Sequence, residues 1–453
     1  MSKIIVAGAG HGGLVAAARL AAAGHSVTVL EKCKKGCVGH CQKDAFDSSS
    51  AEFARINFPV HFKAPKNRLT FIGGDRSAEP VTLPVVDDGT SLWADRRELM
   101  ALLIAQAESA GAKIVYECEI TGASVLGDRI VGVKTQFGTV YADLVIDACG
   151  VNSPVRQSLP SFTLIQNELG RFDRLFTYRA FYDKVPGVPE PETRYNIYLD
   201  RNGVDGFEWL ITEKDSADML VARFYEPAGD EIAAAAESVC KENPHIAGAP
   251  VREGARSVIP VRQPLAVFVA DGYAAVGDSA CMTSPVKGSG INNSLRAGVI
   301  LAETVIKDTN GFYRTETLWE YEREYFKSVG LDSCRLALLK NALPYITAED
   351  IKSFLGRGVL TNEELELLSA DALAAVMSSK GINAIREKLK IFADFPEMKS
   401  LLLDIARWFG RWAVIEPFFP QKYEREAVEK WAVRYNEFFE SIKYNGEKRN
   451  VSE

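Results

Sequence analysis

Long hydrophobic runs are missing from this chain of 453 residues. A membrane-spanning helix needs about eighteen or more consecutive apolar residues, and the longest candidate, residues 14–23, is interrupted by Arg19. An excess of positive charge is missing too, since 53 Lys and Arg stand against 60 Asp and Glu and give a net charge of −7. We therefore expect no membrane-spanning segment and no nucleic-acid partner, because general nucleic-acid binders are usually basic.

The eight cysteines show no spacing typical of a disulfide framework or a metal site. No signal-peptide pattern precedes the first expected strand, so we expect reduced thiols in a cytoplasmic protein. The cysteines at 33, 37 and 41 are separated by three residues each, whereas zinc sites favour C-x₂-C pairs. We predict no metal, and leave open whether these three thiols have a redox role, contact a substrate or have no role.

A strand, a glycine-rich turn, a helix and a second strand open the chain. Lys3–Ala7 is a β-branched run, the turn GAGHGG follows, and an alanine-rich stretch leads to the run HSVTVLE. Such a βαβ unit binds a dinucleotide, because the free N–H groups at the helix start hold the pyrophosphate. The pattern alone does not distinguish NAD from FAD.

Each glycine of this turn has an expected mechanical role. Gly8 permits the tight turn, Gly10 lets a pyrophosphate approach the backbone, and Gly13 lets the helix pack closely on the strand. Glu31 ends the second strand 21 residues after Gly10, a position where a carboxylate accepts hydrogen bonds from a ribose diol.

Two later segments favour FAD. Residues 144–156 read LVIDACGVNSPVR, a strand that runs into Asp147 and Gly150. Residues 272–298 place Gly277 and Asp278 after a strand, and Gly288-Ser289-Gly290 before a helix. The aspartate can bind ribityl hydroxyls, and the positive end of the helix can stabilise negative charge on a reduced flavin.

With these three motifs in this order, residues 1–330 resemble the flavoproteins of the p-hydroxybenzoate-hydroxylase superfamily, which include the geranylgeranyl reductases. The resemblance implies FAD as cofactor and places Arg97 near it; the alternative for Arg97 is a surface residue at a helix start, since Arg96 adjoins it. The expected cofactor-binding residues are Gly8, Gly10, Gly12, Gly13, Glu31, Lys32, Arg97, Gly150, Gly277, Asp278, Gly288, Gly290, Ile291 and Asn292.

The resemblance and the residue pattern together predict an α/β chain of three parts. Residues 1–60, 93–157 and 256–311 are expected to form a Rossmann-like FAD-binding domain. Residues 61–92 and 158–255 are expected to form an inserted antiparallel-sheet substrate domain, because their runs alternate β-branched and aromatic residues. Residues 312–453 show charged and apolar faces at helical spacing and predict a C-terminal helical domain.

Within the superfamily, the pattern favours the geranylgeranyl reductase-like branch. The segment GSGI is followed by a helix, an aromatic Tyr-Glu segment at residues 319–322 and a long helical tail. Aromatic hydroxylases commonly have a histidine where this chain has Cys281, although Asn292 matches their pattern. Residues 207–212 lack the Phe-Pro that the reductases tend to carry. No acid can be named as catalytic; the only candidates are the thiols of Cys41 and Cys281.

We therefore predict an FAD-dependent oxidoreductase that reduces carbon–carbon double bonds of an apolar or isoprenoid-like small molecule by hydride transfer. The alternatives are an NAD(P)H-dependent FAD monooxygenase and a flavoprotein electron-transfer subunit that acts on a quinone or a partner protein. No second GxGxxG motif follows the first, so the reductant is expected to be a donor protein or transiently bound NAD(P)H. Residues 401–419 predict either a core-packed helix or a peripheral contact with a membrane surface.

Overall fold

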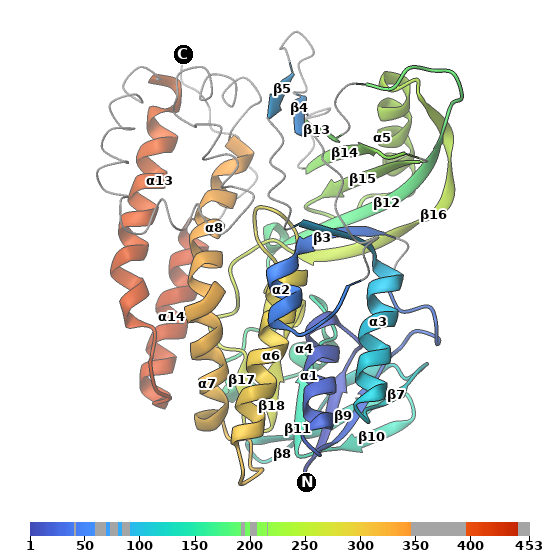
Figure 1. Ribbon diagram of the computed structural model, residues 1–453. Helices are drawn as coiled ribbons and strands as arrows, with labels where there is room; N and C mark the ends of the chain where they lie inside the picture. Colours follow the sequence, from blue (N-terminus) through green and yellow to red (C-terminus); the bar gives the residue numbers. More distant parts are fainter. Residues whose placement is uncertain are drawn as a thin grey trace.

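The computed structural model describes residues 1–39, 42–58, 69–72, 80–83, 91–191, 195–199, 206–214, 216–345 and 396–442. Within these ranges the chain is a mixed α/β molecule (Figure 1). A largely parallel sheet with helices against it lies next to a larger, mostly antiparallel sheet, and a group of C-terminal helices packs alongside. Among the helices of these ranges, none combines the length and apolar character needed to cross a membrane.

The largely parallel sheet, sheet A, has six strands, and every neighbouring pair is parallel except the edge pair β17 and β18. Its strands are buried apolar runs, as expected for a sheet covered on both faces. In spatial order they are β17 (Val269–Ala270), β18 (Tyr273–Ala275), β11 (Leu144–Asp147), β1 (Lys3–Ala7), β2 (Ser26–Leu30) and β7 (Lys113–Val115).

Three helices pack together against sheet A (Figure 1): α1 (His11–Ala22), α3 (Arg96–Ser109) and α6 (Ile291–Lys307). Helix α1 is rich in alanine, a strong helix former, and most of its residues are buried. A three-stranded antiparallel sheet of β8 (Ile120–Leu126), β9 (Arg129–Thr135) and β10 (Gly138–Tyr141) contacts β11 through β9, and the short helix α4 (Pro154–Gln157) packs on β8.

The second large sheet, sheet C, has seven strands and is antiparallel except where β13 runs parallel to β4. Helix α5 (Gly229–Glu242) covers one face, where Val239 packs against Tyr182 and Met219. Strand β15 is buried along its whole length rather than on alternate residues, because both faces of the sheet are covered there. In spatial order the strands are β16 (Ile246–Pro260), β12 (Arg174–Lys184), β15 (Ala217–Arg223), β14 (Gly206–Thr212), β13 (Tyr195–Leu199), β4 (Leu69–Ile72) and β5 (Val81–Leu83).

A two-stranded antiparallel sheet of β3 (Lys43–Asp47) and β6 (Ser91–Asp95) connects the two large sheets, and α2 (Ser48–Phe53) follows β3 directly. Asp95 caps α3 by accepting a hydrogen bond from the backbone N–H of Arg97 (2.9 Å). The strands of sheet A lie within the segments expected for the FAD-binding domain, whereas β16 of sheet C runs past the expected boundary at residue 255 to Pro260. The division of the chain into domains stays a proposal.

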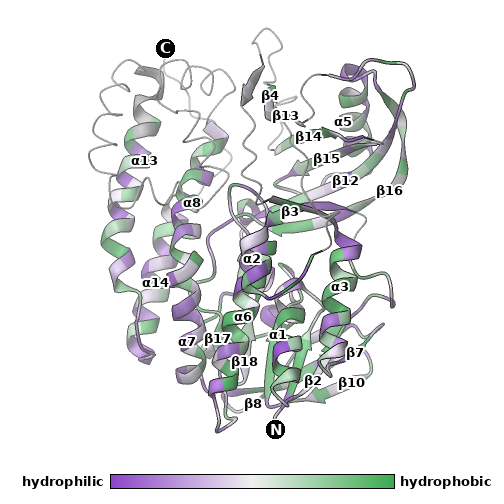
Figure 2. Ribbon diagram, viewed as in Figure 1, coloured by the Kyte–Doolittle hydropathy of each residue, from purple (hydrophilic) through white to green (hydrophobic). Residues whose placement is uncertain are grey.

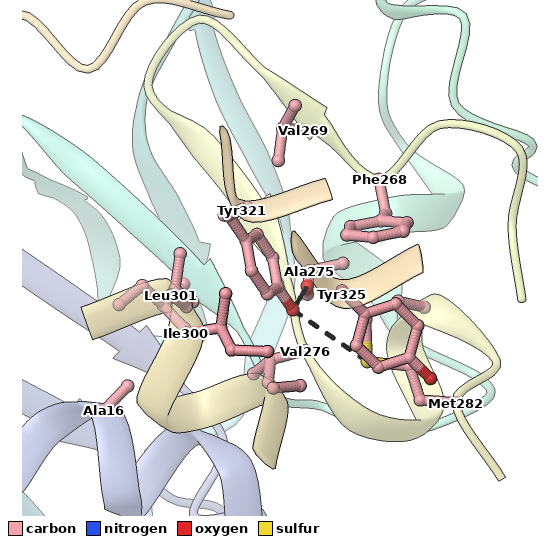
Figure 3. Close-up of a cluster of buried hydrophobic side chains, with 14 of the residues drawn as sticks. Ala16, Phe268, Val269, Ala275, Val276, Met282, Ile300, Leu301, Tyr321 and Tyr325 are labelled. Carbon is pink, nitrogen blue, oxygen red and sulfur yellow. Dashed lines mark hydrogen bonds between the residues drawn. The ribbon is translucent and has the colours of Figure 1, made fainter. Parts of the chain in front are cut away.

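The C-terminal helices are α7 (Thr315–Tyr325), α8 (Leu331–Ala342), α13 (Pro396–Ile415) and α14 (Arg425–Ser441), with a π-helical turn between α7 and α8. They dock on sheet A through aromatic side chains. Figure 3 shows Tyr321 and Tyr325 of α7 around Phe268, and the Tyr321 hydroxyl donates to the carbonyl of Ala275 (2.9 Å). Tyr435 of α14 donates to the carbonyl of Pro264 (2.7 Å).

Residues 401–419 form most of α13 and the short 3-10 turn after it. Trp412 and Phe419 are buried, whereas Val414 and Phe418 are exposed. Figure 2 accordingly shows hydrophobic and hydrophilic turns alternating along α13. The helix is therefore packed into the core on one face, and contact of its outer face with a membrane surface stays a prediction.

Candidate active site

The glycine-rich turn after β1 forms a cradle at the start of α1. Gly8 has a φ of +85°, and a Cβ there would lie 2.7 Å from the carbonyl oxygen of Ala148. A Cβ at Gly13 would lie 2.9 Å from Val6 Cγ1 of β1 and 2.6 Å from the Ala148 side chain. Helix α1 begins without a side-chain cap and without an acid in its first turn. Its N–H groups and positive dipole end are thus available to an anion such as a pyrophosphate.

The remaining two glycines of the turn serve packing across long sequence distances. A Cβ at Gly10 would lie 2.9 Å from the Ala148 carbonyl oxygen, and a Cβ at Gly12 would lie 2.5 Å from the carbonyl oxygen of Ser294 on α6. Gly298 of α6 makes the same close approach to α1, since a Cβ added at Gly298 would lie 2.3 Å from the carbonyl oxygen of Gly12. Sequence reasoning missed the contact between α1 and α6, because the partners lie nearly three hundred residues apart and share no local pattern.

Glu31 lies at the end of β2, directly beside the cradle. Its buried carboxylate accepts hydrogen bonds from the backbone N–H groups of Ala9 and Cys33, both at 2.8 Å. These two contacts orient the acid toward the glycine turn, where a ribose would lie. The next residue, Lys32, is exposed.

His11, the first residue of α1, carries a buried Nε2 atom with no hydrogen-bond partner in the described part of the chain. Burial and, to a smaller extent, the Arg96 guanidinium lower the pKa of His11 to about 4, although Asp44 opposes this shift. The imidazole is therefore neutral at pH 7. An unpartnered buried nitrogen at an uncapped helix start is a feature that a bound nucleotide would satisfy, so the cradle fits the expected cofactor.

A second helix start lies beside the first. Gly277 has a φ of +70° and leads into Asp278, whose carboxylate accepts a hydrogen bond from Thr283 Oγ1 (2.6 Å). Burial raises the pKa of Asp278, which Thr283 and Arg96 partly oppose. Helix α6 begins at Ile291 after Gly290, again without a side-chain cap or an acid in the first turn. Ile291 is buried, and Gly288 has a φ of +64°.

Strand β3 is fastened to this loop. Asn292 accepts a hydrogen bond from the backbone N–H of Asp47 (2.9 Å) through Oδ1 and donates one to the Asp47 carboxylate (2.6 Å) through Nδ2. The Ser289 hydroxyl lies 3.4 Å from the carbonyl oxygen of Ala45. Strand β3 therefore lies over the loop from Gly288 to Asn292, the segment expected beside the flavin.

The two arginines at the start of α3 point in different directions. Arg97 is exposed, and its Nε lies 3.5 Å from the carbonyl oxygen of Gly39. This position agrees with the alternative expectation for Arg97, a surface residue at a helix start. Arg96 points inward and binds the Asp44 carboxylate of β3 through Nε (2.6 Å) and Nη2 (2.8 Å). Helical spacing could have identified it, because Arg96 lies on the same face as the buried Leu99 and Leu103.

Asp147 and Gly150 lie behind the cradle. Asp147 is fully buried and accepts hydrogen bonds from Cys149 N–H (3.0 Å), Ser153 Oγ (2.5 Å) and Tyr273 Oη (2.8 Å). Its carboxylate thus fixes the loop after β11. Gly150 has a φ of +84° with open space around its Cβ position, so its role is to turn this loop.

The cysteines give no support to thiol chemistry in the described residues. Cys281 is fully buried, and burial raises the pKa of its thiol to about 11, which does not suit a nucleophile. Burial and Glu31 raise the pKa of Cys33 to about 11 as well. Cys41 lies outside the described residues. No group of three or more potential metal ligands occurs in the parts of the chain that the structure describes.

One face of sheet C is turned toward this site; we call it the cofactor-side face. Ile259 of β16 belongs to this face and contacts the loop that precedes α6, since a Cβ at Gly288 would lie 3.4 Å from Ile259 Cδ1. Trp209 and Phe207 of β14 pack against the same apolar group as Ile259. The strand registers place the members of this face in rows, namely Leu175, Thr177, Arg179 and Phe181 of β12, Asp218, Leu220 and Ala222 of β15, Phe207, Trp209 and Ile211 of β14, and Tyr195, Ile197 and Leu199 of β13.

A balanced group of charges joins this face to β3. Arg179 binds the Asp218 carboxylate through Nε (2.8 and 3.1 Å) and also through Nη2, and its Nη1 lies 4.0 Å from Asp44 Oδ1. Asp44 is thus shared between Arg179 and Arg96. Burial raises the pKa of Asp44, but the two guanidinium groups lower it below its ordinary value overall. Lys43 pairs with Glu213 at the end of β14.

Comparison with known proteins gives one family and several relatives. The family model described as FAD binding domain matches residues 1–329. A digeranylgeranylglycerophospholipid reductase of Methanothrix thermoacetophila is 25% identical over 380 residues, which are 78% of this chain and 90% of that protein. A probable electron transfer flavoprotein-quinone oxidoreductase of Escherichia coli is 28% identical over 241 residues, 50% of this chain and 52% of that protein.

Among solved structures, a geranylgeranyl bacteriochlorophyll reductase-like protein of Thermoplasma acidophilum has a TM-score of 0.67 at 18% identity. The match covers 89% of this chain and 99% of that one. At this identity the likeness concerns the fold alone. The fold class expected from the sequence is confirmed, and so is FAD as the expected cofactor.

Proposed function

The chain belongs to the family that shares this FAD-binding domain and is an FAD-dependent oxidoreductase, and on this premise we propose that it reduces carbon–carbon double bonds of an apolar, isoprenoid-like substrate. The observation that carries the proposal is the aromatic and aliphatic cofactor-side face, whose Ile259 contacts Gly288. Gly288 opens the loop from Gly288 to Asn292, which we expect beside the flavin and call the flavin-side loop. The reductase from Methanothrix, aligned over most of its length, supports the same assignment.

Bound FAD supplies the hydride-transfer chemistry. The chain's own residues have three tasks. The start of α1 and Glu31 would hold the dinucleotide, and the uncapped start of α6 would offer N–H donors to negative charge on a reduced flavin. Trp209, Phe207 and Ile259 present an apolar wall that excludes water from the reacting double bond. Asp44 is held ionised by its two arginines, so it orients them rather than supplying a proton at neutral pH.

The test is an anaerobic reaction of the dithionite-reduced holoenzyme with polyprenyl alcohols. We expect the flavin to be reoxidised and the product to be heavier by one molecule of hydrogen. In a parallel experiment, NADPH could reduce the flavin rapidly, and the reduced enzyme could then consume oxygen and hydroxylate an added aromatic compound. That result would identify a monooxygenase, and the proposal would be wrong.

A second candidate function is electron transfer to a quinone. The E. coli relative favours it, because 28% identity extends over half of this chain. In that case a soluble quinone reoxidises the reduced flavin, and no polyprenyl alcohol becomes saturated. Both substrates are therefore tested on the same reduced enzyme.

A further inference from the structure

One row of residues crosses the cofactor-side face near its middle. Arg179 of β12 pairs in register with Leu220 of β15, Leu220 with Trp209 of β14, and Trp209 with Ile197 of β13. Residues opposite one another in adjacent strands project from the same face. The Arg179 guanidinium accordingly lies over the Trp209 ring, 5.4 Å from its centroid.

This row lies next to the flavin-side loop through β3. Arg179 approaches Asp44 of β3, and three residues further along the same strand Asp47 is held by Asn292 at the start of α6. On the neighbouring strand β16, Ile259 contacts the Gly288 position. A substrate between the flavin and sheet C would therefore meet the Arg179–Trp209 row.

Two N–H-bearing atoms of this row, Arg179 Nη1 and Trp209 Nε1, make no hydrogen bond to a described residue. Nε and Nη2 of Arg179 are both used by Asp218, but Nη1 makes no hydrogen bond within the described part of the chain. The indole Nε1 of Trp209 is buried and also lacks a partner among the described residues. Buried N–H groups are nearly always paired in folded proteins. The side chains that carry these two donors lie against each other, with the guanidinium of Arg179 5.4 Å from the centroid of the Trp209 ring.

The acceptor should be uncharged, because the charges around it are already balanced. Arg179 is matched by Asp218, Arg96 by Asp44, and Lys43 by Glu213. Burial opposes the charge on Arg179, but the carboxylates of Asp218 and Asp44 raise the pKa of its guanidinium. Burial raises the pKa of Asp218, which Arg179 partly opposes. The other titratable groups facing this cluster are Asp278, His11 and Tyr195, and none of them adds a positive charge at neutral pH. A substrate anion would therefore be buried without a counter-charge, at a high desolvation cost.

We propose that Arg179 Nη1 and Trp209 Nε1 together bind the carbonyl oxygen of the substrate, and that this carbonyl is conjugated to the double bond that is reduced. A carbonyl oxygen offers two lone pairs and no donor of its own, so it can accept from both N–H groups. The inference rests on the proposed reductase function and deepens it, since it changes the substrate class from a plain polyene to an α,β-unsaturated carbonyl compound.

The two donors then have a chemical role as well as a binding role. When a hydride adds to the carbon of the double bond far from the carbonyl, the electron pair of that bond moves toward the carbonyl oxygen. Arg179 and Trp209 stabilise the negative charge there. A proton from solvent then adds to the near carbon, so the substrate gains one hydride and one proton while the reduced flavin loses the hydride and is oxidised.

Three probes with a common styrene skeleton test the inference. These are benzylideneacetone, which has the conjugated ketone, β-methylstyrene, which lacks the oxygen, and cinnamate, which carries a carboxylate. Binding to the oxidised holoenzyme is followed by the change in the flavin absorbance spectrum. We expect benzylideneacetone to bind about tenfold more tightly than β-methylstyrene, as two hydrogen bonds would provide, and more tightly than cinnamate.

Two variants each remove one of the two proposed donors. Trp209→Phe keeps an aromatic ring and loses the N–H. Arg179→Lys keeps a positive charge beside Asp218, but it loses Nη1 together with the hydrogen bonds that Nε and Nη2 make to Asp218. Both should reduce the preference for the ketone over the hydrocarbon. The matched controls are Arg223→Lys, whose buried arginine pairs with Glu208 on the other face of sheet C, and Trp412→Phe, whose indole Nε1 is also buried without a partner among the described residues. Both controls should keep the full preference.

Two results would overturn the inference. One is equal binding of ketone and hydrocarbon by the unmodified enzyme, and the other is tightest binding of cinnamate with loss of that binding in Arg179→Lys. If Arg179→Lys fails to fold, judged by flavin content and thermal melting, Trp209→Phe decides alone. Failure of the proposed function is distinguishable: the ketone preference then persists although the dithionite-reduced enzyme saturates neither the ketone nor a polyprenyl alcohol. Reduction of polyprenyl alcohols without a ketone preference would refute only the inference.

Discussion

Asn292 holds Asp47 across 245 residues of sequence, through one hydrogen bond to the Asp47 backbone and one to its carboxylate. These contacts fasten β3 over the loop that opens α6. Asn292→Ala should weaken FAD binding by about tenfold, because each lost hydrogen bond contributes about 0.5–1.5 kcal/mol. Titration of the apoprotein with FAD by calorimetry measures this change.

The control for this prediction is Asn243→Ala. Asn243 also makes two hydrogen bonds, to Tyr198 and to the carbonyl of Val239, but on the side of sheet C that faces α5. It should lower the melting temperature and leave the FAD dissociation constant unchanged. An equal loss of FAD affinity in both variants would show that the effect of Asn292 is general destabilisation.

Arg96 and Arg97 form a natural pair for testing which arginine serves the cofactor. Arg96 is held by Asp44 and lies close enough to Asp278 to affect its pKa, whereas Arg97 is exposed. We expect Arg96→Ala to weaken FAD binding by at least about tenfold, since buried Asp44 then loses both hydrogen bonds from Arg96 and keeps only the 4.0 Å ion pair with Arg179. Arg97→Ala should change the dissociation constant by less than about twofold. The opposite ranking would restore Arg97 as the cofactor ligand.

The contact between α1 and α6 depends on glycine at both crossing points. Gly298→Ala would place a Cβ 2.3 Å from the carbonyl oxygen of Gly12, so the helices must separate. We expect the free energy of unfolding to fall by about 1–3 kcal/mol, as overpacking does. Gly410→Ala in α13 has open space around the new Cβ and should stabilise the protein by up to about 1 kcal/mol. Urea unfolding of both variants checks the pair, and a stable Gly298→Ala protein with unchanged FAD affinity would contradict the close approach.

Glu322 of α7 should make stability depend on pH. Its fully buried carboxyl accepts hydrogen bonds from the N–H groups of Phe268 (2.6 Å) and Val269 (2.9 Å), yet burial raises its pKa well above the ordinary 4.5. The folded protein keeps a proton that the unfolded chain releases above that value. The contribution of Glu322 to stability is therefore complete at low pH and falls as pH rises toward the folded pKa, by at most about 1.4 kcal/mol per unit.

Glu322→Gln removes this titration. The free energy of unfolding of Glu322→Gln relative to the unmodified protein should therefore increase between about pH 5 and about pH 8, in urea titrations at each pH. Glu320→Gln, at the surface of the same helix, should show no such trend. A constant difference over this range for Glu322→Gln would mean that the carboxyl is already ionised in the folded state.

The sequence predicted the parts of the site that local patterns encode. The turn from Gly8 to Gly13, the acid at Glu31 and the helix start at Gly290 each depend on neighbouring residues, and they lie next to one another in the structure. The strands of sheet C were also visible as alternating runs. Helical periodicity could have shown that Arg96 points inward and Arg97 outward. Because the two arginines are adjacent in the sequence, the motif alone did not tell which of them faces the site. The contacts made by Asp44, Asp47 and Arg179 could not be predicted, because each partner comes from a different element and its side chain has many possible neighbours.

The order of strands in sheet A has a consequence for how the chain is made. Strand β11 pairs on one side with β1, early in the chain, and on the other with β18, where Val145 lies opposite Tyr273. A ribosome that adds about 5–20 residues per second needs on the order of ten seconds to deliver β18 after β11. During that interval β11 presents an unpaired apolar edge, which is an aggregation hazard. Nascent chains should therefore recruit chaperones until the residues of β18 have emerged.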